Sequence, residues 1–466
     1  MRPSPKDQAH QPLDRSLHQA ALRALGLSLS SLCLALSLSA CADSTDELDG
    51  ATPSAGATEP DERLDAGPPL DQNILGERED MGGGMDEGAF IQNPPDPLPP
   101  SPEEVIASLI APGPHQVGYQ TEEISYEAPS LDGEEAETRS LKLAWWYPSA
   151  DQEGSLAPYG LGPRSTRVGL GGASVLEELS EAPVLIFSHG NSGIPEQSYF
   201  LTEHFASHGW VVLAVEHRGN TLSDMSEPMY RLFELRPLDV SAALDHLEAL
   251  PSEHPLAGRV SGSDWALAGH SFGGYTTLAV GGGGYQLDEL LALCQDPPEE
   301  QREACAYTIG SQERYRAGFS DPRLKALIPM TPVGAELFGG ERGLRQMNAP
   351  VMMMTAGLDL TLPNHREGDP LWAALDQPEG VRVDFTHAGH FSFSNACEIA
   401  MSLLESDGCG ERFTPYLELH ALINLYALAF AELHVLGRDW VAPVARGDVL
   451  PPQAAGLLTI SLKSEP

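Results

Sequence analysis

Short apolar runs alternate with longer segments of helical periodicity between residues 113 and 440 of this chain. The short runs are rich in Val, Leu, Ile and Ala, which is typical of strands buried on both faces of a parallel sheet. The expected strands cover residues 182–188, 210–215, 265–268, 324–330, 351–356 and 382–386. The expected helices cover residues 198–208, 236–250 and 417–436, and another begins at residue 272. This alternation predicts an α/β fold, with a mostly parallel central sheet and helices on both faces.

Two further segments modify the alternation. Residues 116–127 and 140–147 are separated by a turn at residues 131–133, and their pattern predicts an antiparallel strand pair at one sheet edge. Residues 281–319 are not needed for the sheet, and they contain four consecutive glycines, a short predicted helix at 287–293 and two cysteines. We expect this insertion to form a small lid or a wall over a substrate site.

The segment before the predicted domain has a different composition. It is rich in Pro, Gly, Asp and Glu, it has almost no aromatic residue, and Arg63 and Arg78 are its basic residues. Such a segment buries too little apolar surface to offset the entropy of ordering its backbone. We therefore predict a disordered acidic linker over residues 41–112 and a folded domain over residues 113–466.

The first forty residues have the pattern of an export signal. Arginines precede an apolar run over residues 24–38, which is too short to span a membrane comfortably and is followed by small residues. We predict a signal peptide over residues 1–40. The sequence Leu-Ser-Ala-Cys that ends at Cys41 resembles the lipobox of bacterial lipoproteins, which implies a covalent lipid anchor on Cys41. The residue that follows, Ala42, favours the outer membrane of a Gram-negative bacterium by the same resemblance; an ordinary signal peptide cut near residue 40 is the alternative.

Charge and cysteine content narrow the possible partners. The formal net charge of −40 argues against nucleic acid, since phosphate binding needs clustered Lys and Arg. Four cysteines remain after Cys33 and Cys41, and four cysteines in an exported chain allow three pairings. Proximity in the sequence favours the pairs Cys294–Cys305 and Cys397–Cys409. No Cys-x-x-Cys occurs, so we expect no metal site.

The candidate chemistry centres on Gly269-His270-Ser271-Phe272-Gly273. This sequence has the form G-x-S-x-G, with a predicted strand before it and a predicted helix after it, as in a nucleophile elbow. Glycines are needed on both sides of the serine because side chains there would collide across the tight turn. The N-terminus of the following helix directs N–H groups to the place where negative charge develops in acyl transfer. We therefore predict Ser271 to be the nucleophile.

The partners of the serine follow it in the order acid, then histidine. Asp359 comes just after the strand at 351–356, where a carboxylate can orient an imidazole; a capping role in the turn is the alternative. His390 lies on a Gly-containing loop after the last predicted strand, and we predict it to be the general base. His387, three residues earlier, is the alternative base.

The loop after the first buried strand is the candidate for the oxyanion hole. It has the sequence Ser-His-Gly-Asn-Ser-Gly over residues 188–193. We predict that the backbone N–H groups of Asn191 and Phe272 are the two donors, each contributing roughly 3 kcal/mol to lowering the barrier. His189 is expected to be a packed, structural histidine.

Four motifs resemble the platelet-activating-factor acetylhydrolase and dienelactone-hydrolase-like branch of the α/β-hydrolases. They are FSHG at 187–190, ASHGW at 206–210, AVEHR at 214–218 and GHSFGG at 269–274. The resemblance implies an α/β-hydrolase fold and a serine esterase without a cofactor. Two departures limit it: dienelactone hydrolases proper use cysteine where this chain has Ser271, and the acetylhydrolases place their acid one strand earlier than Asp359.

These observations together predict a carboxylic ester hydrolase that acts through an acyl-enzyme on Ser271. The expected substrate is a small-molecule or lipid ester, with no cofactor, and we expect a monomer. Two alternatives stay open on the same fold. A secreted peptidase or acyltransferase would share the three catalytic residues, and a catalytically inactive surface binding protein would retain only the scaffold.

Overall fold

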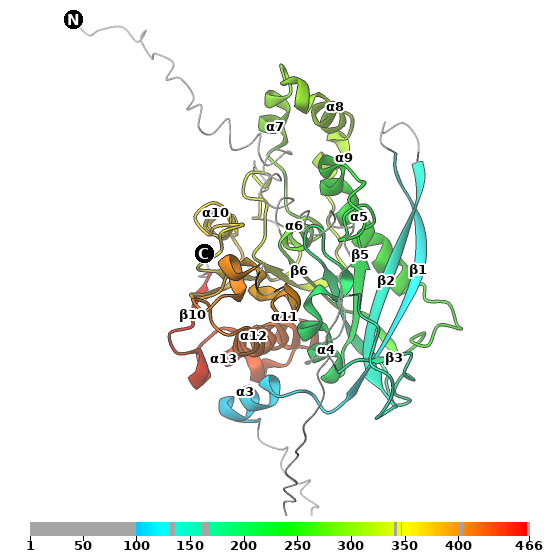
Figure 1. Ribbon diagram of the computed structural model, residues 1–466, viewed down its shortest axis with the longest axis vertical. Coiled ribbons are helices and arrows are strands. Elements are labelled where there is room, and N and C mark those ends of the chain that lie inside the picture. The colour runs from blue at the N-terminus through cyan, green and yellow to red at the C-terminus, as the bar shows by residue number, and fades with distance from the viewer. Residues whose placement is uncertain are drawn as a thin grey trace, which may run out of the picture. The chain divides into compact units, whose positions relative to one another are not determined.

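A mixed sheet of ten strands runs through the protein in the order β10-β9-β8-β7-β6-β4-β5-β2-β1-β3. In Figure 1, β10 lies on the left of the molecule, and β1 and β2 lie on the right. The computed structural model describes residues 99–130, 136–160, 168–339, 343–345, 347–400, 402 and 404–463. The strands are β1 (Gln116–Pro129), β2 (Ala136–Ser149), β3 (Leu170–Gly171), β4 (Ala182–Ser188), β5 (Val211–Glu216), β6 (Val260–His270), β7 (Leu324–Met330), β8 (Met352–Ala356), β9 (Val381–Phe385) and β10 (Leu458–Leu462). Every helix and strand named here belongs to one compact unit of the chain.

The middle of the sheet is parallel. β4 pairs with β5 on one side and with β6 on the other, and β7, β8 and β9 continue the parallel series from β6. β2 pairs antiparallel with both β5 and β1, so the predicted strand pair lies toward one edge. At the other edge β10 pairs antiparallel with β9. The predicted α/β fold with a mostly parallel sheet is confirmed.

Four helices cover one face of the sheet. They are α3 (Pro102–Ile110), α4 (Tyr199–Ser207), α12 (Tyr416–Leu436) and α13 (Ala442–Ala445), and their apolar side chains form a single buried cluster with the strands. α12 is long and apolar enough to cross a membrane by length and composition, with a mean hydropathy of 1.5. However, 78% of its apolar window is buried inside the protein, so burial in the core accounts for its composition.

The opposite face carries α5 (Met229–Glu248), α6 (Phe272–Val280) and α10 (Gly368–Ala374), which pack into a second buried cluster. α5 begins at Met229, earlier than the predicted start at residue 236, and Pro237 therefore lies inside the helix. Proline has no N–H group, so it leaves the carbonyl four residues before it without its helical donor. In this protein the hydroxyl of Tyr275 donates to that carbonyl, which belongs to Phe233, at 2.5 Å.

The predicted linker ends too late. Residues 102–110, which we assigned to it, form α3, an ordered helix with a Ser101 capping box and buried Val105, Ile106 and Leu109. Three apolar positions spaced along one helical face are enough to dock a short helix against α12, even in an acidic, Pro-rich context. The signal peptide, Cys41 and residues 41–98 of the predicted linker lie outside the described residues.

The insertion at residues 281–319 is largely helical. It contains α7 (Leu287–Leu293), α8 (Arg302–Gly310) and α9 (Gln312–Ala317), which lie together next to α5 (Figure 1). The disulfide Cys294–Cys305 joins the end of α7 to α8. The hydroxyl of Tyr307 donates to Glu234 of α5 at 2.7 Å, and Arg314 forms an ion pair with the same carboxylate. The insertion is therefore tied to the helix that packs beside α6.

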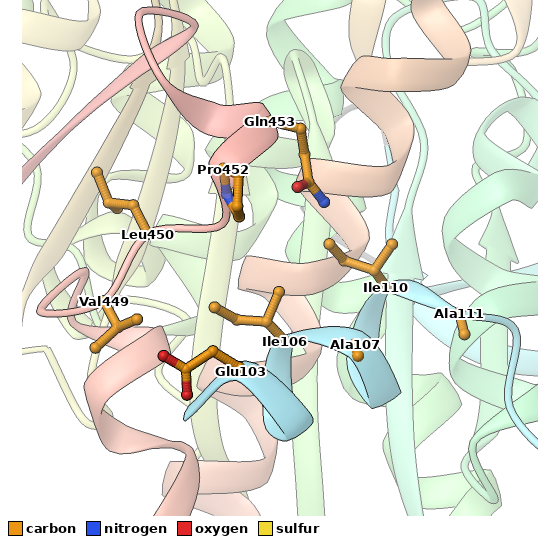
Figure 2. A pocket seen from close by; sticks show the side chains of 9 residues that line it. All are labelled: Glu103, Ile106, Ala107, Ile110, Ala111, Val449, Leu450, Pro452 and Gln453. Carbon is orange, nitrogen blue, oxygen red and sulfur yellow. The ribbon is translucent and has the colours of Figure 1, made fainter. Parts of the chain in front are cut away.

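A pocket of about 490 Å³ lies between α3 and the segment around residue 450. Ile106 and Ile110 of α3 line one side, and Val449, Leu450 and Pro452 line the other (Figure 2). None of the residues that the sequence assigns to catalysis lines this pocket.

Candidate active site

The turn between β6 and α6 holds Ser271 in an unusual backbone conformation. Ser271 has φ 58° and ψ −115°, a region that L-amino acids with a side chain rarely adopt. Its N–H donates to the carbonyl of Met330, at the end of β7, at 2.9 Å. The strand before it ends at His270 and the helix after it begins at Phe272. This is the strand–turn–helix geometry of the predicted nucleophile elbow.

The positions of the glycines around Ser271 leave no room for a side chain. A Cβ at Gly269 would overlap the carbonyl of Gly273, and a Cβ at Gly273 would overlap the carbonyl of Ser188. A Cβ at Gly190 would lie 3.4 Å from the Cβ of Ser271. The predicted oxyanion loop at residues 188–193 thus passes close to Ser271, and the small glycines allow the two backbones to approach.

The three predicted catalytic side chains form one hydrogen-bonded chain. His390 Nε2 lies 3.0 Å from Ser271 Oγ, and His390 Nδ1 lies 2.8 Å from Asp359 Oδ2. The other carboxylate oxygen of Asp359 accepts from the N–H of Leu362 at 2.6 Å. His390 and Asp359 are buried, whereas Ser271 is partly exposed and accessible to a ligand.

The pKa shifts of His390 and Asp359 favour an ionised Asp359 hydrogen-bonded to His390. Burial disfavours the charged form of His390, but attraction to Asp359, their hydrogen bond and the charge of Asp407 outweigh it and raise its pKa above the usual 6.5. Burial likewise disfavours the Asp359 carboxylate, but His390 and the Leu362 N–H outweigh burial and lower its pKa. An ionised Asp359 accepts the Nδ1 proton of His390, which leaves Nε2 free to accept the proton of Ser271.

The two predicted oxyanion donors have free N–H groups. Among the described residues, no hydrogen bond is donated by the backbone N–H of Asn191 or of Phe272. The side chain of Asn191 is held by Asn220, whose Nδ2 donates to Asn191 Oδ1 at 2.8 Å. Arg236, fully buried, donates in turn to Asn220 Oδ1 at 2.5 Å and to the carbonyl of His189. The predicted oxyanion loop is therefore fixed by a buried arginine that no sequence motif marks.

A second hydrogen-bonded chain links the oxyanion loop to the base. The N–H of Gly190 donates to Gln197 Oε1 at 2.9 Å, and Gln197 Nε2 lies 2.9 Å from His270 Nδ1. His270 Nε2 lies 3.0 Å from the carbonyl of His390. Burial, with repulsion from His390, lowers the pKa of His270 to about 3, so the ring is neutral and donates from Nε2 to that carbonyl. The only feature of the sequence that points to a role for His270 is its position next to Ser271 in the G-x-S-x-G motif. No feature of the sequence points to Gln197.

A second Ser–His–Asp arrangement lies beneath the site. Ser188 Oγ is 2.9 Å from His217 Nε2, and His217 Nδ1 is 2.9 Å from Asp239 Oδ2. All three residues have 0% exposure, and Arg139 donates to both oxygens of Asp239. Because Ser188 is fully buried, no substrate can reach its hydroxyl, and it cannot act as a nucleophile. The three residues instead connect the ends of β4 and β5 to α5 by hydrogen bonds.

The competing histidines do not reach Ser271. The imidazole of His387 is exposed and makes no hydrogen bond to a described residue, although its backbone carbonyl accepts from Thr414. His189 is completely buried, and it accepts the N–H of His217 at Nε2, as expected of a structural histidine. Within the described ranges, no group of three or more His, Cys, Asp or Glu side chains could hold a metal ion.

Comparisons with known proteins find similarity to esterases and to one family model. The family "Platelet-activating factor acetylhydrolase, isoform II" matches residues 161–226, a part of the chain that contains Asn191 but ends before Ser271. Cutinase est1 of Thermobifida alba is 23% identical over 227 residues, which are 48% of this chain and 59% of the cutinase. The match thus spans less than two thirds of that relative.

A solved structure shares the fold over most of the chain. The ferulic acid esterase from Streptomyces cinnamoneus superposes with a TM-score of 0.53 and 20% identity, and covers 75% of this chain and 98% of its own. At 20% identity this similarity confirms that the chain has an α/β fold. The chemistry of the chain has to be inferred from the site itself.

Proposed function

We propose that this protein is a serine esterase that hydrolyses carboxylic esters through an acyl-enzyme intermediate. The observation that carries the proposal is the chain Ser271–His390–Asp359, with distances of 3.0 and 2.8 Å, set beside two free backbone N–H groups. The similarity to a cutinase and to a ferulic acid esterase supports the same class of reaction.

The steps follow from the positions of the atoms. His390 Nε2 takes the proton of Ser271 as its oxygen attacks the ester carbonyl, and the N–H groups of Asn191 and Phe272 stabilise the oxyanion. The alcohol leaves with the proton from His390. A water then gives its proton to His390 and attacks the acyl-enzyme, and the carboxylic acid leaves as Ser271 regains its proton.

Exposed apolar side chains on two loops of the site support an ester with an apolar acyl or alcohol part. Leu360, directly after Asp359, is 59% exposed, and Leu222 is 55% exposed. The N–H of Leu222 donates to the carbonyl of Gly193 in the oxyanion loop. Apolar surface on both loops would contact a short-chain or lipid-like acyl group, in line with the substrate class inferred from the sequence.

p-Nitrophenyl esters of graded acyl length test the reaction. We expect hydrolysis by the wild type, and Ser271→Ala should reduce kcat by a factor on the order of 10⁶. Ser263→Ala is the matched control, because Ser263 is exposed on the same strand, β6, and should leave the rate unchanged.

A fluorophosphonate probe separates the alternatives. It should label the wild type on Ser271 and leave the buried Ser188 unlabelled. A wild type inert toward both the esters and the probe would instead indicate a binding protein. Peptide cleavage without ester cleavage would indicate a peptidase, and acyl transfer to an added alcohol in preference to water would indicate an acyltransferase.

We also propose that Cys41 carries a lipid that anchors the protein to the outer membrane. The support is the lipobox-like sequence that ends at this residue. Metabolic labelling with an alkyne fatty acid should mark the wild type, and Cys41→Ser should abolish both the label and membrane association. An unlabelled, soluble wild type would contradict the proposal.

A further inference from the structure

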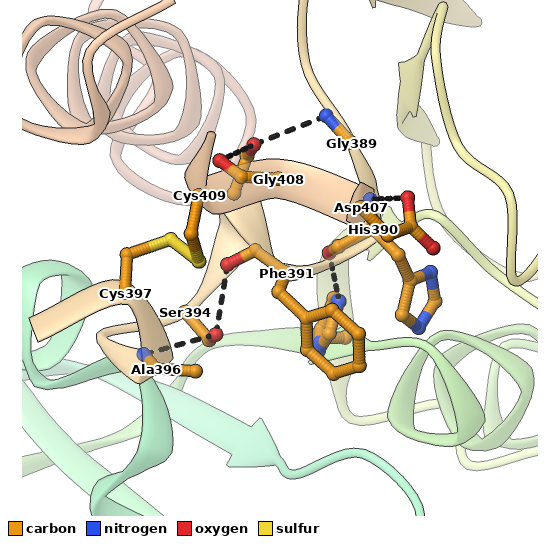
Figure 3. The surroundings of a disulfide bond; sticks show 11 residues. Gly389, His390, Phe391, Ser394, Ala396, Cys397, Asp407, Gly408 and Cys409 are labelled. Carbon is orange, nitrogen blue, oxygen red and sulfur yellow. Dashed lines mark hydrogen bonds between the residues drawn. A yellow bond between two sulfur atoms is a disulfide. The ribbon is translucent and has the colours of Figure 1, made fainter. Parts of the chain in front are cut away.

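A second buried carboxylate, Asp407, lies next to the catalytic chain without touching the serine. It is 6% exposed and lies two residues before the disulfide cysteine Cys409 (Figure 3). Its Oδ1 accepts from the backbone N–H of His390 and of Leu360, each at 3.0 Å. Its Oδ2 accepts from the N–H and the hydroxyl of Thr361, at 2.9 and 2.7 Å.

These contacts connect the loops that carry the acid and the base. Leu360 and Thr361 directly follow Asp359, and the third backbone donor is that of His390 itself. One side chain therefore holds both loops by hydrogen bonds to their backbones. Charge-assisted hydrogen bonds to a carboxylate are stronger than neutral ones, so they define the spacing of the loops firmly.

The Asp407 carboxylate makes no ion pair with a described Lys or Arg. The arginine nearest in sequence, Arg412, donates to the carbonyl of Ser406 and packs over the ring of Phe413. The negative charge is therefore balanced by N–H and O–H dipoles, and its field acts on the imidazole of His390. The other titratable groups that face His390 are Asp359 and His270, and His270 is neutral.

We propose that Asp407 is a positioning residue for the reaction at Ser271, which holds the acid and base loops at one spacing. Its charge also favours the protonated form of His390. The predicted effects on kcat and kcat/KM rest on the proposed esterase function. The predicted effect on the pKa of His390 does not, because it can be measured in the free protein without turnover.

Asp407→Asn removes the charge and breaks the geometry with almost no change in volume. The amide has one acceptor oxygen, and its NH₂ group would face at least one of the N–H donors that now bind the carboxylate. We expect kcat for a p-nitrophenyl ester to fall by about 100-fold, as for a displacement of about 1 Å at a reacting group. The acid limb of kcat/KM should move to lower pH, because His390 loses a charge that raises its pKa.

Two further variants separate charge from geometry. Thr361→Val removes one hydrogen bond and keeps the charge, so kcat should fall less and the acid limb should stay in place. Glu405→Gln is the control for net charge, because Glu405 is an exposed acid in the same disulfide loop, and it should match the wild type. Far-ultraviolet circular dichroism reports whether each variant is folded.

The titration of His390 can be followed by NMR in the Ser271→Ala protein, with and without Asp407→Asn. A lower pKa of the imidazole in the double variant supports the proposal even if no ester is hydrolysed, which would count against the esterase function alone. An unchanged pKa together with an unchanged kcat overturns it. If Asp407→Asn does not fold, an unchanged kcat in Thr361→Val overturns it instead.

Discussion

Ser271 has a positive φ although it is not a glycine, and the surrounding contacts keep it there. The hydrogen bond from its N–H to Met330 joins the turn to the neighbouring strand β7, and Gly273 allows α6 to start against the end of β4. Strain of this kind costs on the order of 1–3 kcal/mol, and the packed sheet around it supplies the compensation. The hydroxyl is thereby held at 3.0 Å from His390 before any substrate binds.

Asp359→Asn tests whether the acid acts on the base. The amide can donate to His390 Nδ1, which would favour the imidazole tautomer with its proton on Nε2, the atom that must accept from Ser271. We expect kcat/KM for p-nitrophenyl acetate to fall by roughly 10⁴-fold. Asp264→Asn is the matched control, because Asp264 is paired with Lys325 on the surface of the sheet, and its rate should stay within about twofold of the wild type. A similar loss in both variants would assign the effect to stability.

That Ser271, His390 and Asp359 come together was predictable, because each lies at a recognisable place: a glycine-flanked turn for Ser271, and loops after buried strands for Asp359 and His390. The supporting residues were not predictable. Asp407 lies in a polar loop with no periodic pattern, and Gln197 is one polar residue among several after β4. Their importance comes from hydrogen bonds over long sequence separations, which a linear pattern does not contain.

The loop from Cys397 to Cys409 is the element that supports the base. It contains α11 (Ala396–Ala400) in part, and its end carries Asp407 and Gly408 against Gly389 and His390 (Figure 3). The hydroxyl of Ser392 also donates to the carbonyl of Gly408 at 3.2 Å. The disulfide thus closes a segment whose Asp407 accepts a hydrogen bond from His390, the proposed base.

The two disulfides should differ in what their removal does. Each closes a short loop, with sequence separations of 11 and 12, and should contribute about 3 kcal/mol to the free energy of unfolding. We expect the double serine variant of Cys397 and Cys409 to lose activity as well as stability at 25 °C. The double serine variant of Cys294 and Cys305 should lose stability and keep most of its kcat. Melting temperature and ester hydrolysis on the same samples measure both effects, and equal kcat in the two variants would contradict the assignment.

At the scale of elements, the positions of the parallel strands were predicted because each contains a short apolar run. The ends of β6 were not: it was predicted over residues 265–268 and spans Val260–His270, since its first residues are largely polar and exposed. β7 matches its prediction, and β8 and β9 differ by one residue at their ends. Elements at the edges were missed: β10 reads as a short polar-apolar segment near the C-terminus, and it is a strand because β9 offers it an open edge. α3 was missed for a similar reason, since its stability comes from packing on α12.

The stability of the whole domain should depend on pH, because four histidines are buried in their neutral form. Burial lowers the pKa of His204, His217, His270 and His420 to about 3. In the unfolded chain these rings take up protons below their usual value of 6.5, whereas in the folded protein they stay neutral to about pH 3. Stability contributed by each ring is therefore complete above pH 6.5, and falls by about 1.4 kcal/mol per pH unit as the pH drops from 6.5 toward 3.

His204 allows this argument to be tested on one group. It lies on α4, and its Nε2 donates to the carbonyl of Leu109 in α3 at 2.8 Å; burial comes first and repulsion from His208 second among the causes that lower its pKa. His204→Gln keeps an N–H donor for Leu109 but cannot titrate. We expect the free energy of unfolding of the wild type to fall by about 2 kcal/mol more than that of this variant between pH 7 and pH 5, measured by urea unfolding.

Buried glutamates with raised pKa, such as Glu367 and Glu432, change the stability in the opposite direction, but they are common to both proteins and cancel in the difference. Parallel loss of stability in the two proteins would contradict the prediction, because it would mean that folding does not lower the pKa of His204.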